Sequence, residues 1–166
     1  LLSLFCLAGI VMANAQRFAL IDMEYIMENI PEYQQANNEL ELASQQYQKA
    51  VEAKAKEAEA LYLAYQKAAN TLSATQRTQK EEAIVAKERE AAELRKKYFG
   101  PEGEMAQKQE ALIAPIQNRI YEAVKQISSQ KGYDAVIDRA SATSIIFASP
   151  RIDISNEVLV KLGYSN

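Results

Sequence analysis

Closely spaced carboxylates are the side chains of this chain best placed to do chemistry, since paired acids can act as general acid and base. The densest group alternates acidic and basic residues: Glu81, Glu82, Lys87, Glu88, Arg89, Glu90, Glu93, Arg95 and Lys96. Opposite charges three or four residues apart lie beside each other on a helix and pair in solvent. The pattern therefore indicates a solvated helix face laced with ion pairs, and not a catalytic dyad.

The other reactive side chains lack the partners that catalysis needs. The chain has no histidine, which removes the commonest general base and the commonest metal ligand. Ser128 and Ser129 therefore have no candidate base, and Asp134 and Asp138 alternate with apolar residues as solvent-facing or turn residues do. The Gly-Pro-Glu-Gly segment at 100–103 is not a phosphate loop, because no lysine follows and no strand precedes it. We expect no enzyme activity, no cofactor and no metal site.

The composition favours long helices over a thick globular core. Of the 166 residues, 48% are hydrophobic and 25% are charged, but there is no tryptophan and only four phenylalanines. Much of the hydrophobic fraction is alanine, which buries little area. The formal net charge of −3 argues against general nucleic-acid binding, which needs a basic surface.

The first residues, LLSLFCLAGIVMANA, are apolar and uncharged and end in Ala-Asn-Ala. Small residues in this spacing are typical of a signal-peptidase site, so we predict a secretory signal over 1–15 that is cleaved before Gln16. The segment does not start with an initiator methionine or with the basic residues that open a signal peptide, so we expect further residues before Leu1. The alternative is an uncleaved membrane anchor, although the segment is shorter than the about 20 residues that span a bilayer. Cleavage would remove Cys6, the one cysteine, and with it disulfide and thiol chemistry.

Heptad spacing predicts a long helix from Pro31, which suits a first helical position and has Asn29 nearby as a possible cap. The apolar seam is Ala36, Leu40, Ala43, Tyr47, Val51, Ala55, Ala58, Tyr62, Tyr65, Ala69 and Leu72. Its steps alternate between four and three except for three successive fours, which predicts a stutter over 47–55. We expect Asn70 to end the helix in a left-handed cap.

A second helix then returns antiparallel to the first. Ser-Ala-Thr-Gln at 73–76 matches a capping box, so the hairpin turns near 70–76. The return leg has its own apolar seam: Ile84, Ala91, Leu94, Tyr98, Met105, Leu112, Ile116, Ile120, Val124 and Ile127. We predict a hinge at Gly100, Pro101 and Gly103, where Gly100 ends one helix and Pro101 opens the next. The alternative is a plain loop between two separate helices.

The two ends of the chain predict a small β-containing body over 16–30 and 116–166, with the hairpin arm over 31–115. Strands are expected at 18–21, 133–138 and 144–148, and a short helix at 156–162 that Gly163 ends. Such a body buries too little area to stand alone, so we expect it to oligomerise through its strands. The residues assigned to this contact are Phe18, Leu20, Val136, Ile137, Ile145 and Phe147. The fold class is thus mainly α with a small β body.

Two features of the hairpin suggest binding to other molecules. It carries more aromatic and apolar residues than one seam can hide: Tyr47, Leu61, Tyr62, Leu63, Tyr65, Tyr98 and Phe99. Tyr47, Tyr62 and Tyr65 could equally fill the seam, whereas Leu63 and Phe99 lie off it. Near the turn, Lys67, Arg77 and Lys80 lie in a segment without acidic residues, and this basic tip could attract lipid headgroups or acidic segments.

The order of these segments resembles the Skp/OmpH family of periplasmic chaperones for outer-membrane proteins. The matching parts are the apolar start, the strand at 18–21, Pro-Glu-Tyr at 31–33, the strand at 133–138 and Asp-Ile-Ser-Asn-Glu-Val-Leu at 153–159. The resemblance implies a homotrimer in which three hairpins surround a cavity for unfolded outer-membrane proteins. It also implies an ATP-independent holdase of the periplasm. The alternative is a coiled-coil scaffold or spacer of the cell envelope, whose apolar side chains would all be buried.

Overall fold

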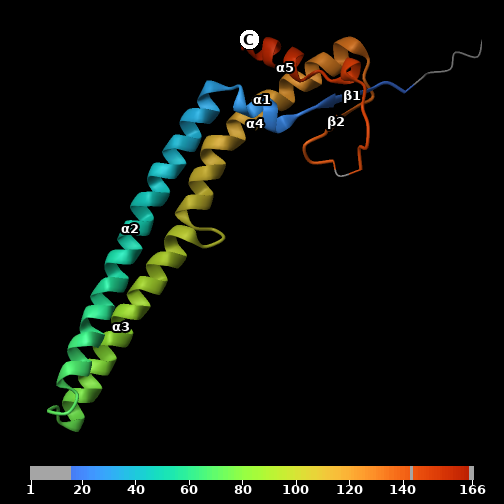
Figure 1. The fold of residues 1–166 in the computed structure, drawn as a ribbon. Helices are drawn as coiled ribbons and strands as arrows, with labels where there is room; N and C mark the ends of the chain where they lie inside the picture. Colours follow the sequence, from blue (N-terminus) through green and yellow to red (C-terminus); the bar gives the residue numbers. More distant parts are fainter. Residues whose placement is uncertain (1–15, 143, 165–166) are drawn as a thin grey trace, which may run out of the picture. The chain divides into compact units, whose positions relative to one another are not determined.

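The computed structural model describes residues 16–142 and 144–164, and the predicted signal lies outside them. Its elements are β1 (Phe18–Ile21), α1 (Met23–Glu28), α2 (Pro31–Ala68), α3 (Ala74–Phe99), α4 (Glu104–Lys131), β2 (Ala135–Asp138), a 3-10 turn (Pro150–Ile152) and α5 (Ser155–Leu162) (Figure 1). The chain divides into two compact units. The hairpin unit is Met27–Arg119, and the body unit combines the chain up to Ile26 with the chain from Ile120.

The mainly helical fold with a long hairpin and a small sheet, predicted from the sequence, is confirmed. α2 and α3 run antiparallel, because the contacts Tyr47–Tyr98 and Tyr65–Glu81 are nearly symmetrical about Ser73. The predicted capping box is present: the Ser73 hydroxyl accepts from the Gln76 N–H, and the Gln76 side chain accepts from the Ser73 N–H. Each bond satisfies a backbone donor that a helix start leaves free.

The two ends of α2 differ from the prediction. The N-cap position of α2 is occupied by Ile30 and not by Asn29, and Ile30 makes no side-chain cap bond. At the other end Ala69 keeps right-handed helical angles, and none of the described non-glycine residues has a positive φ. The hydroxyl and N–H of Thr71 both donate to the Ala68 carbonyl, at 2.8 and 2.9 Å. That carbonyl is thereby satisfied without the left-handed cap predicted at Asn70.

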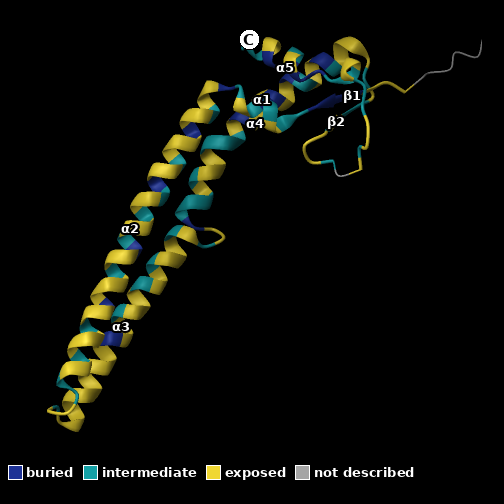
Figure 2. Cartoon of the chain, in the orientation of Figure 1, coloured by how far each residue is buried: buried dark blue, intermediate teal, exposed yellow. Residues whose placement is uncertain are grey.

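The seam between α2 and the return leg is narrow. Figure 2 shows separate buried positions along α2 with exposed surface between them. The buried residues are Ala36, Ala43, Val51 and Ala58. The predicted seam is wrong at Ala55 and Tyr62, which are exposed, whereas Leu61 is half-buried. The half-buried position after Val51 is that of Lys54, so only two steps of four occur in succession. The predicted stutter is too long by one step, and Tyr62 faces outward for that reason.

The turn at 100–103 separates α3 from α4. The Gly100 N–H donates to the Lys96 carbonyl at 2.8 Å, and the Gly103 N–H donates to the Gly100 carbonyl at 2.9 Å. α4 begins at Glu104, so the expectation that Pro101 opens the next helix is wrong. A Cβ at Gly100 would lie 2.4 Å from the Lys96 oxygen, and one at Gly103 would lie 2.8 Å from the Tyr98 oxygen. Only glycine fits either place without moving backbone.

The body contains two parallel strands, with Phe18 opposite Ala135 and Ile21 opposite Asp138. Parallel strands need a long crossover, and here the whole hairpin is that connection. Ile26, Ile120 and Val158 are fully buried in the body.

The strand predicted at 144–148 is wrong, because its described residues form no strand. The free edge of β1 is satisfied in another way, since the Ile154 N–H donates to the Leu20 carbonyl at 2.9 Å. The Ser155 hydroxyl accepts from the Asp22 N–H and bonds the Asp153 carboxylate, which accounts for its burial. α5 follows and ends at Gly163 with φ 93°, as predicted. None of the described helices is both long and apolar enough to cross a membrane.

Candidate binding surface of the hairpin

The predicted aromatic residues divide between the seam and the surface. Tyr47 and Tyr98 stack at 4.1 Å with nearly parallel rings, and Phe99 meets Tyr47 edge-on at 6.3 Å. This stack occupies the seam beside the turn at 100–103. Phe99 nevertheless remains 43% exposed, and Tyr62 and Leu63 are 47% and 48% exposed. The surplus apolar surface expected on the hairpin is therefore present at these three residues.

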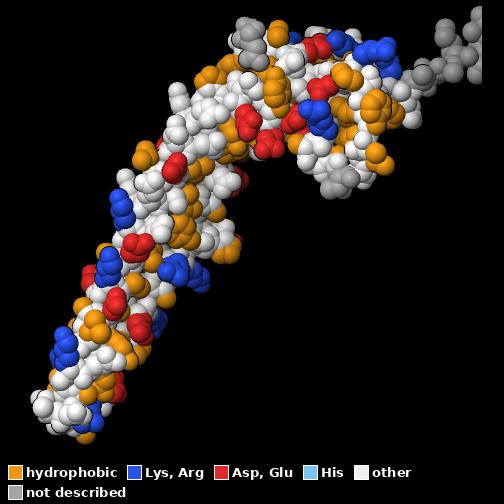
Figure 3. Space-filling model, viewed as in Figure 1, with side chains coloured by type: hydrophobic (Ala, Val, Ile, Leu, Met, Phe, Trp, Pro, Cys, Tyr) orange, Lys and Arg blue, Asp and Glu red, His pale blue; other side chains and the backbone are white. Residues whose placement is uncertain are grey.

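Two further large apolar residues of the hairpin are exposed. Leu42 and Val85 are each 61% exposed, and neither was predicted from the sequence. Their signal was available, since both fall outside the two heptad seams. Leu61 and Tyr65 are half-buried, so they contribute less to the surface. Figure 3 shows hydrophobic side chains interspersed with both signs of charge along the visible face of the hairpin.

Polar groups interact beside the aromatic stack. Lys97 Nζ lies 3.2 Å from Glu104 Oε1. The interaction with the Tyr47 hydroxyl, followed by that with Lys97, lowers the pKa of Glu104 below its ordinary 4.5. The interaction with Glu104, followed by desolvation, raises the pKa of Tyr47 above 10.0. Farther along the hairpin, the Tyr65 hydroxyl bonds Glu81, which raises the pKa of Tyr65.

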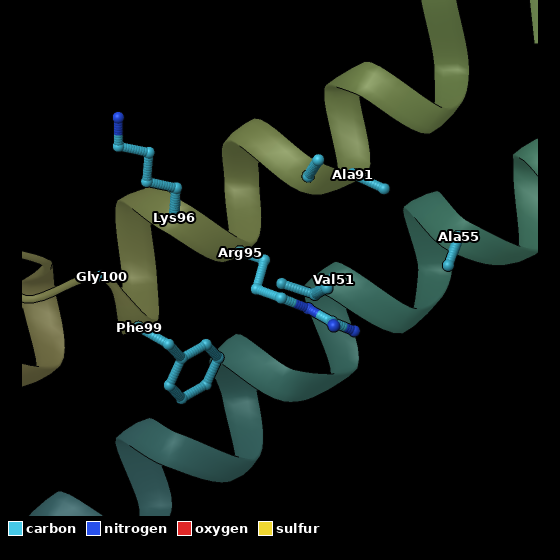
Figure 4. Close-up of a pocket in the computed structure, with 8 residues that line it drawn as sticks. Val51, Ala55, Ala91, Arg95, Lys96, Phe99 and Gly100 are labelled. Carbon is cyan, nitrogen blue, oxygen red and sulfur yellow. The ribbon is translucent and has the colours of Figure 1, made fainter. Parts of the chain in front are cut away.

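A shallow groove runs between α2 and α3 on one side of the seam. It consists of two hollows of about 420 and 400 Å³ that share Ala55 and Ala91 in their linings. The first hollow extends to Phe99 and the second extends to Tyr62. Figure 4 shows the first hollow, with the Arg95 guanidinium and the Phe99 ring directed from α3 toward α2.

Ion pairs of the kind predicted from the mixed charges do occur. Lys87 Nζ lies 2.8 Å from Glu90 and 3.4 Å from Glu57, and Lys54 joins the same group. The bond to Glu90, opposed by desolvation and supported by Glu57, raises the pKa of Lys87. Lys67, Arg77 and Lys80 of the basic tip are exposed, and no ion pair is found for them within the described residues.

The residues assigned to oligomerisation differ in exposure. Phe147 is 85% exposed, and Phe18 and Ile137 are also exposed, whereas Val136 and Ile145 are half-buried. Leu20 lies in the interior of its own chain. The neighbouring Ile146 is fully exposed and was not selected from the sequence. In the described part of the chain, no three acidic side chains are grouped so that they could hold a metal ion.

The fold places the chain in a class of helical-hairpin proteins in which two parallel strands are joined through the hairpin. Residues 17–162 match the family model described as "Outer membrane protein (OmpH-like)", so the chain belongs to the OmpH-like family. The resemblance to the Skp/OmpH family predicted from the sequence is thereby confirmed.

Two relatives illustrate this membership. The chain is 27% identical to the chaperone protein Skp of Yersinia enterocolitica over 153 residues, which is 92% of this chain and 90% of the relative. It also resembles a Caulobacter crescentus structure described as an OmpH-like outer membrane chaperone, with a TM-score of 0.68 and 12% identity. That match covers 89% of this chain and 84% of the other. At such low identity the structural likeness concerns the fold alone.

Proposed function

We propose that this protein is an ATP-independent holdase of the periplasm that binds unfolded outer-membrane β-barrel proteins and prevents their aggregation. Membership of the OmpH-like family is the observation that carries the proposal, and the similarity to a protein named chaperone Skp supports it. Holding needs no chemical step, which agrees with a chain that has no histidine and no nucleotide motif. The periplasm supplies no ATP, so binding and release depend on affinity alone.

The hairpin offers the kind of surface that holding requires. Leu42, Tyr62, Leu63, Val85 and Phe99 are exposed apolar side chains spread along it. Burial of apolar area is worth roughly 25 cal/mol per Å², so each contact is weak while many together hold a long unfolded chain. A spacer would gain nothing from such exposure, and for that reason we prefer the holdase to the scaffold.

Three copies are proposed to associate through the body, with their hairpins around a client cavity. The exposed apolar residues Phe18, Ile137 and Phe147 support an association there. The basic tip, Lys67, Arg77 and Lys80, is proposed to contact lipid headgroups, and the turn at 100–103 to act as a hinge that widens the cavity. Both rest on residue type and exposure.

An aggregation assay tests the holdase proposal. A urea-unfolded barrel protein is diluted with the wild-type protein or with Leu63→Gln, and turbidity is followed. The wild type is expected to suppress turbidity, and the variant to need a several-fold higher concentration, because a side chain that contacts clients becomes polar. Ala64→Gln, at the next exposed position of α2, is the control and should behave as the wild type. Turbidity that the wild-type protein leaves unchanged would contradict the proposal.

A further inference from the structure

The groove between α2 and α3 has opposite charges at its two ends. Arg95 lies at the Phe99 end, and Glu59 and Glu88 line the Tyr62 end. None of these three side chains has an ion pair within the described residues. The neighbouring charges Lys54, Glu57, Lys87 and Glu90 all pair with one another. The charges that border the groove are therefore available to a bound molecule.

The floor of the groove is apolar and divided in two. Ala55 and Ala91 lie where the two hollows meet, and Ala58 and Ala92 extend the floor in either direction. Phe99 and Tyr62 form the outer walls. Two hollows in one line, each of about 400 Å³, suit successive side chains on one face of an extended segment, because these point the same way.

The spacing of the charges sets the size of the occupant. Glu88 and Arg95 are both on α3, seven residues apart, which corresponds to about 10 Å along the helix. An extended chain covers that distance in about three residues. A bound segment would thus place an acidic side chain near Arg95 and a basic one three or four residues away, near Glu59 and Glu88.

We propose that this groove binds an extended segment of client polypeptide, with alternate apolar residues on the alanine floor and opposite charges at the two ends. The inference rests on the proposed function and specifies which clients it favours. Strands of outer-membrane barrels alternate apolar and polar residues, so an unfolded barrel contains many such segments. The surface charges determine the position of the segment, and the two aromatic walls add contact area.

Peptide binding to the full chain from Gln16 tests the groove. The probes are fluorescent peptides of about nine residues with alternate apolar positions. One carries Asp and Lys about four residues apart, a second carries two Asp, and a third carries two Lys. Anisotropy is expected to show the wild type binding the mixed peptide tightest. Arg95→Glu should weaken binding of the mixed peptide about tenfold and make the two-Lys peptide the preferred one.

Matched variants separate the groove from general charge and from folding. Lys49→Glu makes the same charge change on an exposed part of α2 that lines neither hollow, and it should leave the preference unchanged. Ala55→Gln fills the floor and should weaken all three peptides, whereas Ala53→Gln, also exposed on α2 but outside the groove, should not. Equal effects of Arg95→Glu and Lys49→Glu, or an unchanged preference in Arg95→Glu, would overturn the proposal.

Two further readouts separate peptide binding in the groove from self-association and from barrel holding. If Ala55→Gln alters the sedimentation coefficient of the protein alone, the groove is covered by a second copy and the peptide proposal is wrong. If the wild type keeps an unfolded barrel soluble but no groove variant affects peptides, the groove proposal fails and the holdase proposal stands. If the groove variants affect peptide binding but the wild type does not keep an unfolded barrel soluble, the groove proposal stands and the holdase proposal fails.

Discussion

Glu104 is the residue on which the contacts beside the turn at 100–103 converge. Its carboxylate interacts with the Tyr47 hydroxyl and pairs with Lys97, so it links α2, α3 and α4 within the hairpin. Tyr47 in turn stacks on Tyr98. A single ionised group thereby supports an aromatic contact that belongs to the seam. We infer that this group makes the stability of the hairpin depend on pH.

The direction of that dependence follows from the pKa of Glu104, which is lower in the folded protein than its ordinary 4.5. Such a group stabilises the fold fully above about pH 4.5 and loses this effect as the pH falls through the lowered pKa. Glu104→Gln should therefore lower the melting temperature at neutral pH. The melting temperature of the variant should also decrease less than that of the wild type as the pH is lowered. Thermal unfolding followed by circular dichroism between about pH 3 and 7 measures both. Glu102→Gln, on the same turn, is the control, and matching profiles for the two variants would refute the role of Glu104.

Among the elements, the turn at 100–103 has the most demanding backbone. Gly103→Ala would place a methyl group 2.8 to 2.9 Å from two carbonyl oxygens and a backbone nitrogen, so the turn must shift. We expect a loss of about 1–3 kcal/mol in unfolding free energy, measured by urea denaturation. Glu102→Ala, in the same turn, should change it by less than about 0.5 kcal/mol. A Gly103→Ala variant as stable as the wild type would mean that the turn adapts freely.

Local signals predicted the elements that depend on near neighbours. Ser73 and Gln76 are three residues apart at the start of α3, so their capping box can be read from the sequence. The strand predicted at 144–148 does not form. The Leu20 carbonyl at the edge of β1 instead accepts a hydrogen bond from the Ile154 N–H, a partner distant in the sequence. The sequence left Tyr62 open between the seam and the surface for a related reason, since a one-residue drift of the seam depends on which side chain the opposite helix accepts.

At the scale of the whole molecule, the proposed function requires no catalytic centre. Several charges on the hairpin pair with one another, others border a groove, and its apolar residues lie partly on the surface. The groove could not be found from the sequence, because it requires alanines of two helices to face each other at the same level. Membership of the OmpH-like family and the exposed apolar side chains together support the holding of unfolded chains.

The central claim is that the protein holds unfolded outer-membrane proteins without nucleotide. Sedimentation velocity of the chain from Gln16, alone and after rapid dilution of a urea-unfolded barrel protein, tests it most directly. We predict a trimer that moves, on addition of the barrel, to a faster and still soluble complex containing one client. An assembly whose sedimentation does not change while the barrel protein aggregates would contradict the account and favour the scaffold.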